Sequence, residues 1–164
     1  VNTDNNVCTA VVTYTATANG TPAPSYNYVF TGATVGSGSG TGSGATFNKG
    51  ITHVKITASN LCSTATCEFD VTVEDHQNPT INCVVNQTKN TDPGVCTFTV
   101  VGSVFDPTFG DNCPGTTISN NYNNSSSLSG AVFNKGTTTV VWTATDASGN
   151  IATCSFTVTV QDKE

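Results

Sequence analysis

Hydrophobic and polar residues alternate along most of this chain. The run TTTVVWTAT at residues 137–145 places three apolar side chains on one face: Val140, Trp142 and Ala144. The earlier run GITHVKITAS has Lys55 at an intervening position, which indicates that the opposite face is in water. A period of two is typical of strands, and no stretch shows a helical stripe. The pattern therefore predicts an all-β chain built as a sandwich of antiparallel sheets.

Two phrases recur at nearly constant spacing. FNKG occurs at residues 47–50 and at residues 133–136, an offset of 133 − 47 = 86. NTDNNVC at residues 2–8 and NTDPGVC at residues 90–96 are offset by 96 − 8 = 88. The chain is therefore predicted to contain two copies of one Ig-like or fibronectin-like sandwich unit, as arrays of small modules do.

We place the two modules at residues 1–76 and residues 77–164, with only a short joint between them. Copy two begins near Pro79, whereas copy one begins at the equivalent of position 89 or 90, so copy one is expected to lack its first strand. That strand could lie upstream in the same chain, be donated by a neighbouring subunit, or have been removed by truncation. The Gly/Ser run at residues 36–44 and the Asn/Ser run at residues 123–130 are expected to be flexible crossings.

Composition excludes several classes of function. Five lysines, no arginine and eleven acidic residues give a net charge of −6, which argues against nucleic acid as a partner. No apolar run is long enough to insert in a membrane. No HExxH, GxSxG or P-loop motif occurs, so no enzyme is predicted, and His53 and His76 are expected to be solvated surface residues.

Four segments resemble the hyalin repeat (HYR) family. ATDASGNIATCSFTVTV at residues 144–160, PTINC at 79–83 and DNC at 111–113 carry the resemblance in copy two, and TATCEFDVTV at 64–73 carries it in copy one. The resemblance implies tandem Ig-like or fibronectin-like modules that are extracellular and serve adhesion. The family occurs in animal surface proteins and in very large secreted bacterial adhesins.

Seven cysteines without a CxxC motif indicate disulfides and an oxidising, extracytoplasmic compartment. In a sandwich, the opening of the first strand and the beginning of the last lie at the same pole, which favours a bond between Cys83 and Cys154. Elimination then pairs Cys96 with Cys113. Four cysteines permit three pairings, so the connectivity stays open.

The same logic applied to copy one pairs Cys8 with Cys62. Cys67 aligns with the last-strand cysteine of copy two, and its partner would lie upstream of Val1. Cys67 is therefore expected to form a disulfide with a cysteine from elsewhere in an array or from a neighbouring subunit.

Oxygen-bearing side chains occur in the loops expected at one pole of copy two. They are Asp106, Asp111, Asn112, Asp146 and Asn150. Carboxylate and amide oxygens suit Ca²⁺, so a calcium site is a candidate here. Turn formation by the same residues is the alternative, and no other cofactor is predicted.

These observations together predict a non-enzymatic structural repeat of an extracellular adhesin or surface filament. Neighbouring repeats or subunits, arranged head to tail, are the expected partners. Two alternatives stay open: the pole loops could bind a glycan or a cell-surface protein, or the modules could be spacers of a larger secreted enzyme.

Overall fold

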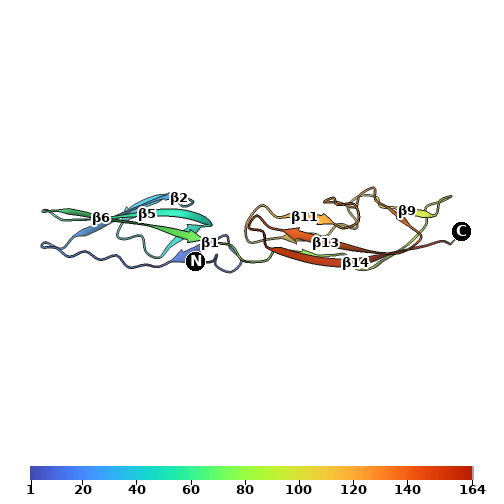
Figure 1. The fold of residues 1–164 in the computed structure, drawn as a ribbon, viewed down its shortest axis with the longest axis horizontal. Helices are drawn as coiled ribbons and strands as arrows, with labels where there is room; N and C mark the ends of the chain where they lie inside the picture. The colour runs from blue at the N-terminus through green and yellow to red at the C-terminus, as the bar shows by residue number, and fades with distance from the viewer. Residues whose placement is uncertain (164) are drawn as a thin grey trace. The chain divides into compact units, whose positions relative to one another are not determined.

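The computed structural model describes residues 1–163, and these residues form strands, turns and loops but no helix (Figure 1). The predicted all-β sandwich class is confirmed. The chain divides into two compact units, Val1–His76 (unit 1) and Gln77–Glu164 (unit 2), and each has its own hydrophobic core. In the part of the chain described, no helix could cross a membrane.

Unit 1 contains six strands in two sheets. They are β1 (Thr9–Val12), β2 (Ser25–Gly32), β3 (Gly36–Ser39), β4 (Ala45–Asn48), β5 (Gly50–Ser59) and β6 (Thr64–Val73). One sheet has the order β3-β2-β5-β6, and β1 pairs with β4 in the other. All of these pairings are antiparallel.

Unit 2 contains eight strands. They are β7 (Thr80–Asn82), β8 (Gln87–Asn90), β9 (Thr97–Thr99), β10 (Thr108–Gly110), β11 (Thr117–Asn120), β12 (Val132–Asn134), β13 (Gly136–Thr145) and β14 (Ile151–Gln161). The main sheet has the order β11-β13-β14-β8, while β7 pairs with β10 and β9 with β12. The β8–β14 pairing is parallel and the others are antiparallel.

Each unit is built on one long antiparallel hairpin, β5–β6 in unit 1 and β13–β14 in unit 2. The inward side chains are those that the period of two predicts: Val140, Trp142 and Ala144 are fully buried, and so is Val54 in unit 1. Lys55, between two inward positions, lies in solvent as expected. Burying one large apolar side chain stabilises the fold by about 1.5–3 kcal/mol, so these faces supply much of the stability of each unit.

The outer face of the β13–β14 hairpin is rich in threonine. Three cross-strand pairs join threonine to threonine: Thr137 with Thr159, Thr139 with Thr157, and Thr143 with Thr153. In the first pair the two hydroxyl oxygens are 3.1 Å apart and share a hydrogen bond. Such pairs stabilise a sheet through hydroxyls and methyl groups, without any charge.

The NTD phrase makes the same turn in both units. An Oδ2 atom of Asp4 accepts a hydrogen bond from the backbone amide seven residues later at 2.9 Å, and Asp92 does the same at 2.8 Å. Asn6 has φ 62° and Gly94 has φ 73°, so the equivalent residue of each turn is left-handed. Asn and Gly are the residues that tolerate this conformation, which explains why the sequences NN and PG are interchangeable here.

The FNKG phrase is also the same structure twice. Phe47 and Phe133 are fully buried in their cores, and Gly50 and Gly136 have φ of 117° and 122°. Only glycine adopts such values without strain. The phrase recurs because it combines a core side chain with a sharp entry into the long hairpin.

The glycine-rich run at residues 36–44 is more ordered than predicted. Its first part forms β3, which pairs with β2. A methyl group on Gly38 would lie 2.9 Å from the Tyr28 hydroxyl, and one on Gly42 would lie 2.6 Å from the Phe30 ring. Glycine is therefore needed here for close packing against aromatic rings, which is the reason the flexible-loop expectation was wrong for β3.

Replacing Gly136 with alanine should destabilise unit 2 by about 1–2 kcal/mol, the cost of forcing an L side chain into left-handed backbone. Space is not the cause, because a methyl group there would meet nothing within 4 Å. Trp142 is the only tryptophan and is buried in unit 2, so urea unfolding followed by its fluorescence reports on this unit.

The matched control is Gly110→Ala, where φ is not positive and the new methyl group would lie 3.8 Å from Thr80 Oγ1. This variant should unfold close to the wild-type urea midpoint. Equal destabilisation by the two substitutions would contradict the argument from backbone conformation.

Candidate functional site

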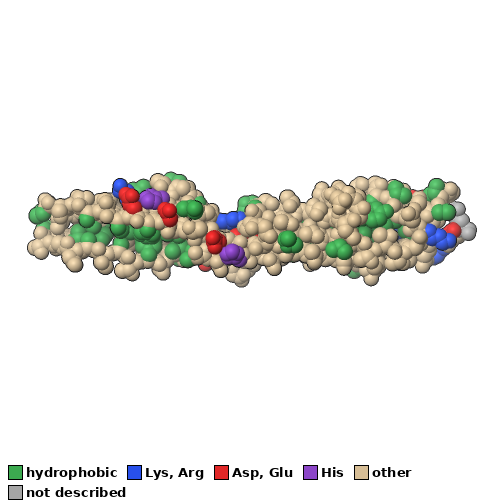
Figure 2. All heavy atoms as spheres, in the orientation of Figure 1, with side chains coloured by type: hydrophobic (Ala, Val, Ile, Leu, Met, Phe, Trp, Pro, Cys, Tyr) green, Lys and Arg blue, Asp and Glu red, His purple; other side chains and the backbone are tan. Residues whose placement is uncertain are grey.

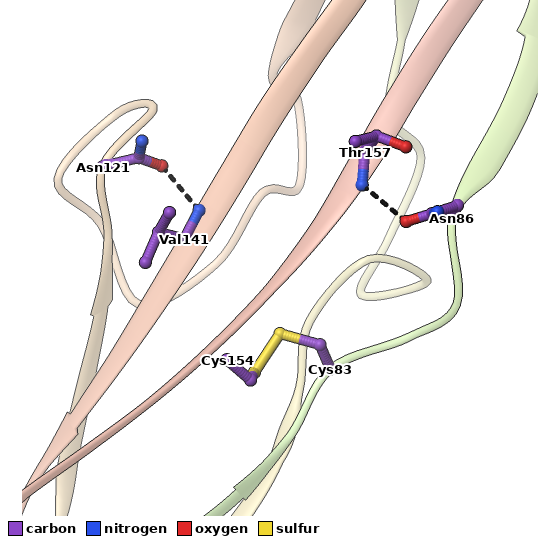
Figure 3. The surroundings of a disulfide bond; sticks show 6 residues. All are labelled: Cys83, Asn86, Asn121, Val141, Cys154 and Thr157. Atoms are coloured by element: carbon purple, nitrogen blue, oxygen red, sulfur yellow. Dashed lines mark hydrogen bonds between the residues drawn. A yellow bond between two sulfur atoms is a disulfide. The ribbon is translucent and has the colours of Figure 1, made fainter.

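The feature that sets unit 2 apart is a covalent clamp between its opening segment and its last strand (Figure 3). Cys83 and Cys154 form a disulfide with an S–S distance of 2.01 Å and a Cα–Cα distance of 5.7 Å, across a sequence separation of 71. Nearby, Asn86 Oδ1 accepts a hydrogen bond from the backbone amide of Thr157 at 2.9 Å. The structure thus brings together the pair of cysteines that sequence reasoning favoured.

Beyond the disulfide, the opening segment continues along the outer edge of β14. β8 pairs with β14 in parallel, from Gln87 opposite Val158 to Asn90 opposite Gln161. Ile81 and Val84, on either side of the bonded cysteine, pack against the core of the unit. The segment therefore covers the outer edge of β14 with backbone, apolar side chains and a covalent bond.

The structure does not form the expected bond between Cys96 and Cys113, because Cys96 has a free, exposed thiol. The carbonyl oxygen of Cys96 accepts a hydrogen bond from the backbone amide of Lys135 at 3.1 Å, at the start of β13. Cys113 lies near the other end of β13, two residues before Gly115, on which a methyl group would be 3.1 Å from the Ala147 side chain. About ten residues of strand, roughly 30 Å, separate these poles, and no disulfide spans that distance.

The expected bond between Cys8 and Cys62 fails for the same reason. The carbonyl oxygen of Cys8 accepts from the amide of Lys49 at 3.2 Å, just before β5 begins. Cys62 lies in the turn at the far end of the β5–β6 hairpin, where its amide donates to Asn60 Oδ1 at 2.9 Å, and its thiol is free and exposed. Elimination paired cysteines from opposite poles, since order along the chain does not reveal which pole a loop occupies.

The candidate calcium ligands are divided between separate loops. Asp106 accepts hydrogen bonds from the Leu128 amide at 2.8 Å and the Ser127 hydroxyl at 2.7 Å, and so anchors the loop that precedes β12. Asp111 Oδ2 accepts from the Cys113 amide at 3.0 Å. Among the described residues, the carboxylates of Asp106, Asp111 and Asp146 do not form a group of close ligand atoms. The hydrogen bonds of Asp106 thus give it a structural role in its own loop.

Asp146 and Asn150 do lie together, in the turn that joins β13 to β14. Asp146 accepts from the amides of Ser148 and Asn150 and from the Asn150 side chain, each at 2.8 Å. Burial of the carboxylate raises its pKa, but these hydrogen bonds outweigh burial and bring the pKa of Asp146 below its ordinary value. The turn is thus more stable above the ordinary carboxyl pKa, and this contribution is lost as pH falls through the lowered pKa.

Turn formation accounts for these hydrogen bonds of Asp146. Asn112 donates from Nδ2 to the sulfur of Cys113 at 3.6 Å, next to Asp111. Calcium binding by Asp106, Asp111, Asn112, Asp146 and Asn150 stays a prediction.

Sequence reasoning missed a charged cluster on the outer face of β5 and β6. His53 Nδ1 lies 2.9 Å from Asp70 Oδ1, its Nε2 lies 3.5 Å from Glu68, and Lys55 lies 2.9 Å from Glu68. The hydrogen bond to Asp70 raises the pKa of His53, with Glu68 adding to the effect. The hydrogen bond from Lys55 lowers the pKa of Glu68. Figure 2 shows charged side chains only in small, separate groups on a largely uncharged face.

The β-sandwich architecture and the disulfide define a class: Ig-like, disulfide-bonded β-sandwich modules. Within that class, the chain belongs to the HYR domain family, which matches residues 74–160. HYR domains are extracellular, and the resemblance expected from the sequence is confirmed for this part of the chain. No curated protein sequence matches the chain significantly.

Three solved structures are similar to this chain at low sequence identity. Drosophila N-cadherin EC1-4 gives a TM-score of 0.38 at 13% identity and covers 85% of this chain and 41% of that chain. Human protocadherin-24 EC1-2 gives a TM-score of 0.35 at 15% identity and covers 84% of this chain and 82% of that chain. A chimeric titin Z1Z2-Z1Z2 tandem gives 0.34 at 15% identity, covering 87% of both. The chain thus spans less than half of the N-cadherin chain.

Removing the clamp with the double substitution Cys83→Ala and Cys154→Ala should destabilise unit 2 by about 4 kcal/mol, the loop-closure entropy for a loop of this length. Urea unfolding followed by Trp142 fluorescence measures the change. Cys96→Ser is the control within the same unit, because its thiol is free and exposed, and it should leave the midpoint nearly unchanged. A double variant as stable as this control would contradict a stabilising role for the bond.

Replacing Asp70 with asparagine should lower the pKa of His53, measured by NMR titration of its ring protons. Glu68→Gln should lower it less, because the Asp70 hydrogen bond is the larger cause. A raised folded pKa contributes stability that is complete below the unfolded pKa of about 6.5 and is lost as pH rises through the folded value. If both variants titrate like wild type, the cross-strand contacts do not persist in solution.

Proposed function

We propose that this chain is a load-bearing structural repeat of an extracellular adhesin or surface filament. The observation that carries the proposal is the clamp between the opening segment and the last strand of unit 2. HYR membership supports the extracellular, adhesion-type setting. Neighbouring repeats or subunits, joined head to tail, are the partners that would transmit the load.

The terminal strands of unit 2 are arranged to resist pulling. β8 lies near the start of the unit and β14 at its end, and the two strands pair in parallel. When the ends of the unit are pulled apart, parallel neighbours slide along each other. With the disulfide reduced, their backbone hydrogen bonds would be loaded together, whereas a peeling geometry would break them one at a time.

The disulfide adds a covalent path for the load. Tension entering from the start of the unit reaches Cys83, crosses to Cys154 and leaves through the rest of β14. The intervening chain, across a sequence separation of 71, carries no tension along its backbone. The interior of the sandwich is thereby shielded from the applied force for as long as the bond is oxidised.

A non-catalytic role is part of this proposal, and HYR membership supports it. His53 is exposed on a strand face between two acidic residues, and His76 lies 3.3 Å from Glu74 on the surface. The free thiols among the described residues, those of Cys62, Cys67 and Cys96, are all exposed. These groups stabilise surfaces and turns, and none is arranged as a nucleophile with its base.

Single-molecule force spectroscopy tests the proposal. The oxidised chain, held at both ends, should lack the extension that unfolding of the clamped loop would release. The Cys83→Ser variant should gain roughly 240 Å of contour length, from about 3.4 Å for each residue across the separation of 71. Cys96→Ser should extend like wild type. Equal contour lengths for wild type and Cys83→Ser would overturn the load-bearing assignment.

A further inference from the structure

Unit 1 contains the same long hairpin as unit 2, but the outer edge of its last strand is largely uncovered. β6 is an edge strand of its sheet, whereas β14 has β8 beside it. Cys67 lies opposite Ile56 in the β5–β6 register, as Cys154 lies opposite Trp142 in the β13–β14 register. The two cysteines therefore occupy equivalent positions, one bonded and the other free and exposed.

The neighbouring core side chain shows the effect of this difference. Phe69 of β6 is only partly buried, while its equivalent in β14, Phe156, is 2% exposed. In unit 2 the cover comes from Ile81 and Val84, which pack against the core on either side of the bonded cysteine. In unit 1 the Tyr14 ring lies edge-on to Phe69, with the ring centroids 4.9 Å apart, yet Phe69 stays only partly buried.

An open groove lies beside Cys67. Its walls are mostly apolar and include Ala16, Tyr26, Ile56 and Ala65. Figure 2 shows hydrophobic side chains exposed in a row across unit 1. The groove thus combines an apolar floor, an unpaired strand edge and a thiol. On β14, the opening segment of unit 2 covers the equivalent apolar surface, pairs with the strand edge and bonds the cysteine.

The edge of β6 already has parallel pairing at one end. The amino group of Val1 donates a hydrogen bond to the Thr72 carbonyl at 2.8 Å, and the Glu74 amide donates to the Val1 carbonyl at 2.9 Å. Asn2 also forms a parallel bridge with Glu74. This pairing corresponds to the end of the β8–β14 ladder in unit 2, at offsets of 90 − 2 = 88 and 161 − 74 = 87. A strand in the groove would extend a ladder that Val1 and Asn2 have begun.

We propose that the groove beside Cys67 binds an extended segment that carries an apolar residue two positions before a cysteine, and that this cysteine forms a disulfide with Cys67. The segment runs parallel to β6, in line with Val1 and Asn2. Its pattern is that of Ile81 and Cys83, so the occupant is the opening segment of a hyalin repeat. This inference rests on the comparison of the two units and not on the load-bearing role.

The bond forms by thiol–disulfide exchange. The Cys67 thiolate attacks the sulfur of the incoming cysteine, which arrives as a mixed disulfide with a small thiol such as glutathione. The new S–S bond forms, the old one breaks, and the small thiol leaves as a thiolate that takes up a proton. No net oxidation occurs, because the mixed disulfide supplies the oxidised sulfur.

The chain carries its own controls for this reaction. Cys62 and Cys96 are also free and exposed, but each belongs to a turn or a short loop at a pole and neither lines the groove. General thiol reactivity would modify all three cysteines. Recognition by the groove would favour Cys67 alone.

The first test uses a synthetic peptide with the sequence of residues 79–88, PTINCVVNQT, its cysteine carried as the glutathione mixed disulfide. Mixed with the full chain, it should modify Cys67 at least about tenfold faster than Cys62 and Cys96, because burial of one isoleucine side chain is worth that much. Peptide mapping by mass spectrometry gives the three rates. A matched peptide with Ile81→Asp should lose the preference. Equal rates at the three cysteines would overturn the proposal, as would a preference unaffected by the aspartate.

The second test places the segment in line. Residues 79–88 are fused directly ahead of Val1 in the full chain, and a matched variant has serine in place of the introduced cysteine. In a buffer of oxidised and reduced glutathione, which supplies the mixed disulfide, the fused cysteine should bond to Cys67, which then escapes alkylation while Cys62 and Cys96 are still modified. The β6 amides should gain protection from hydrogen exchange relative to the serine variant. A Cys67 that stays reactive in the fused chain would overturn the in-line arrangement, whatever force spectroscopy shows for unit 2.

Discussion

Each unit depends on how the outer edge of its last long strand is covered. The ten or so residues of β6 and β14 bury one face against the core, and their inner edges pair with β5 and β13. An open edge exposes unpaired backbone groups and the flanks of core side chains. In unit 2 the opening segment closes this edge through β8, Ile81 and the Cys83–Cys154 bond. The partial exposure of Phe69 in unit 1 shows the same core without that cover.

The cover of β14 links stability to connectivity. The segment that protects the core of unit 2 is also the segment through which the chain enters the unit, so folding and attachment use the same residues. A sandwich whose first strand lay in the middle of a sheet would not have this property. Because the entering and leaving strands run in parallel, the chain enters and leaves unit 2 at opposite poles.

The period of two was enough to predict the buried faces, since Trp142 and its neighbours alternate with solvent positions in one continuous strand. The pairing of Cys83 with Cys154 followed from the general course of a sandwich. The pairings of Cys96 and Cys8 were wrong because they depend on which pole each loop reaches, and loops of similar length can end at either. Local sequence carries no signal for that choice.

The His53–Asp70 contact and the order of β3 could not be predicted from the sequence either, because both depend on how strands pack in three dimensions. The contact of His53 with Asp70 requires the register of β5 on β6, which turn length and core pattern determine jointly. The order of β3 depends on aromatic rings of β2 that fill the space above its glycines. Composition alone suggested a flexible linker, because a Gly/Ser run reads the same whether or not a ring lies against it.

The threonine pairs on the outer face of β13 and β14 have a consequence for the medium in which the module can work. Thr137 and Thr159, like the other pairs, hold the strands side by side with neutral hydroxyls and methyl groups. Dissolved ions screen charged pairs such as Lys55 with Glu68, but they have little to act on here. The strand pairing of this hairpin should therefore keep the same cohesion in fresh water and in brine, so its surface is suited to an environment that the cell does not control.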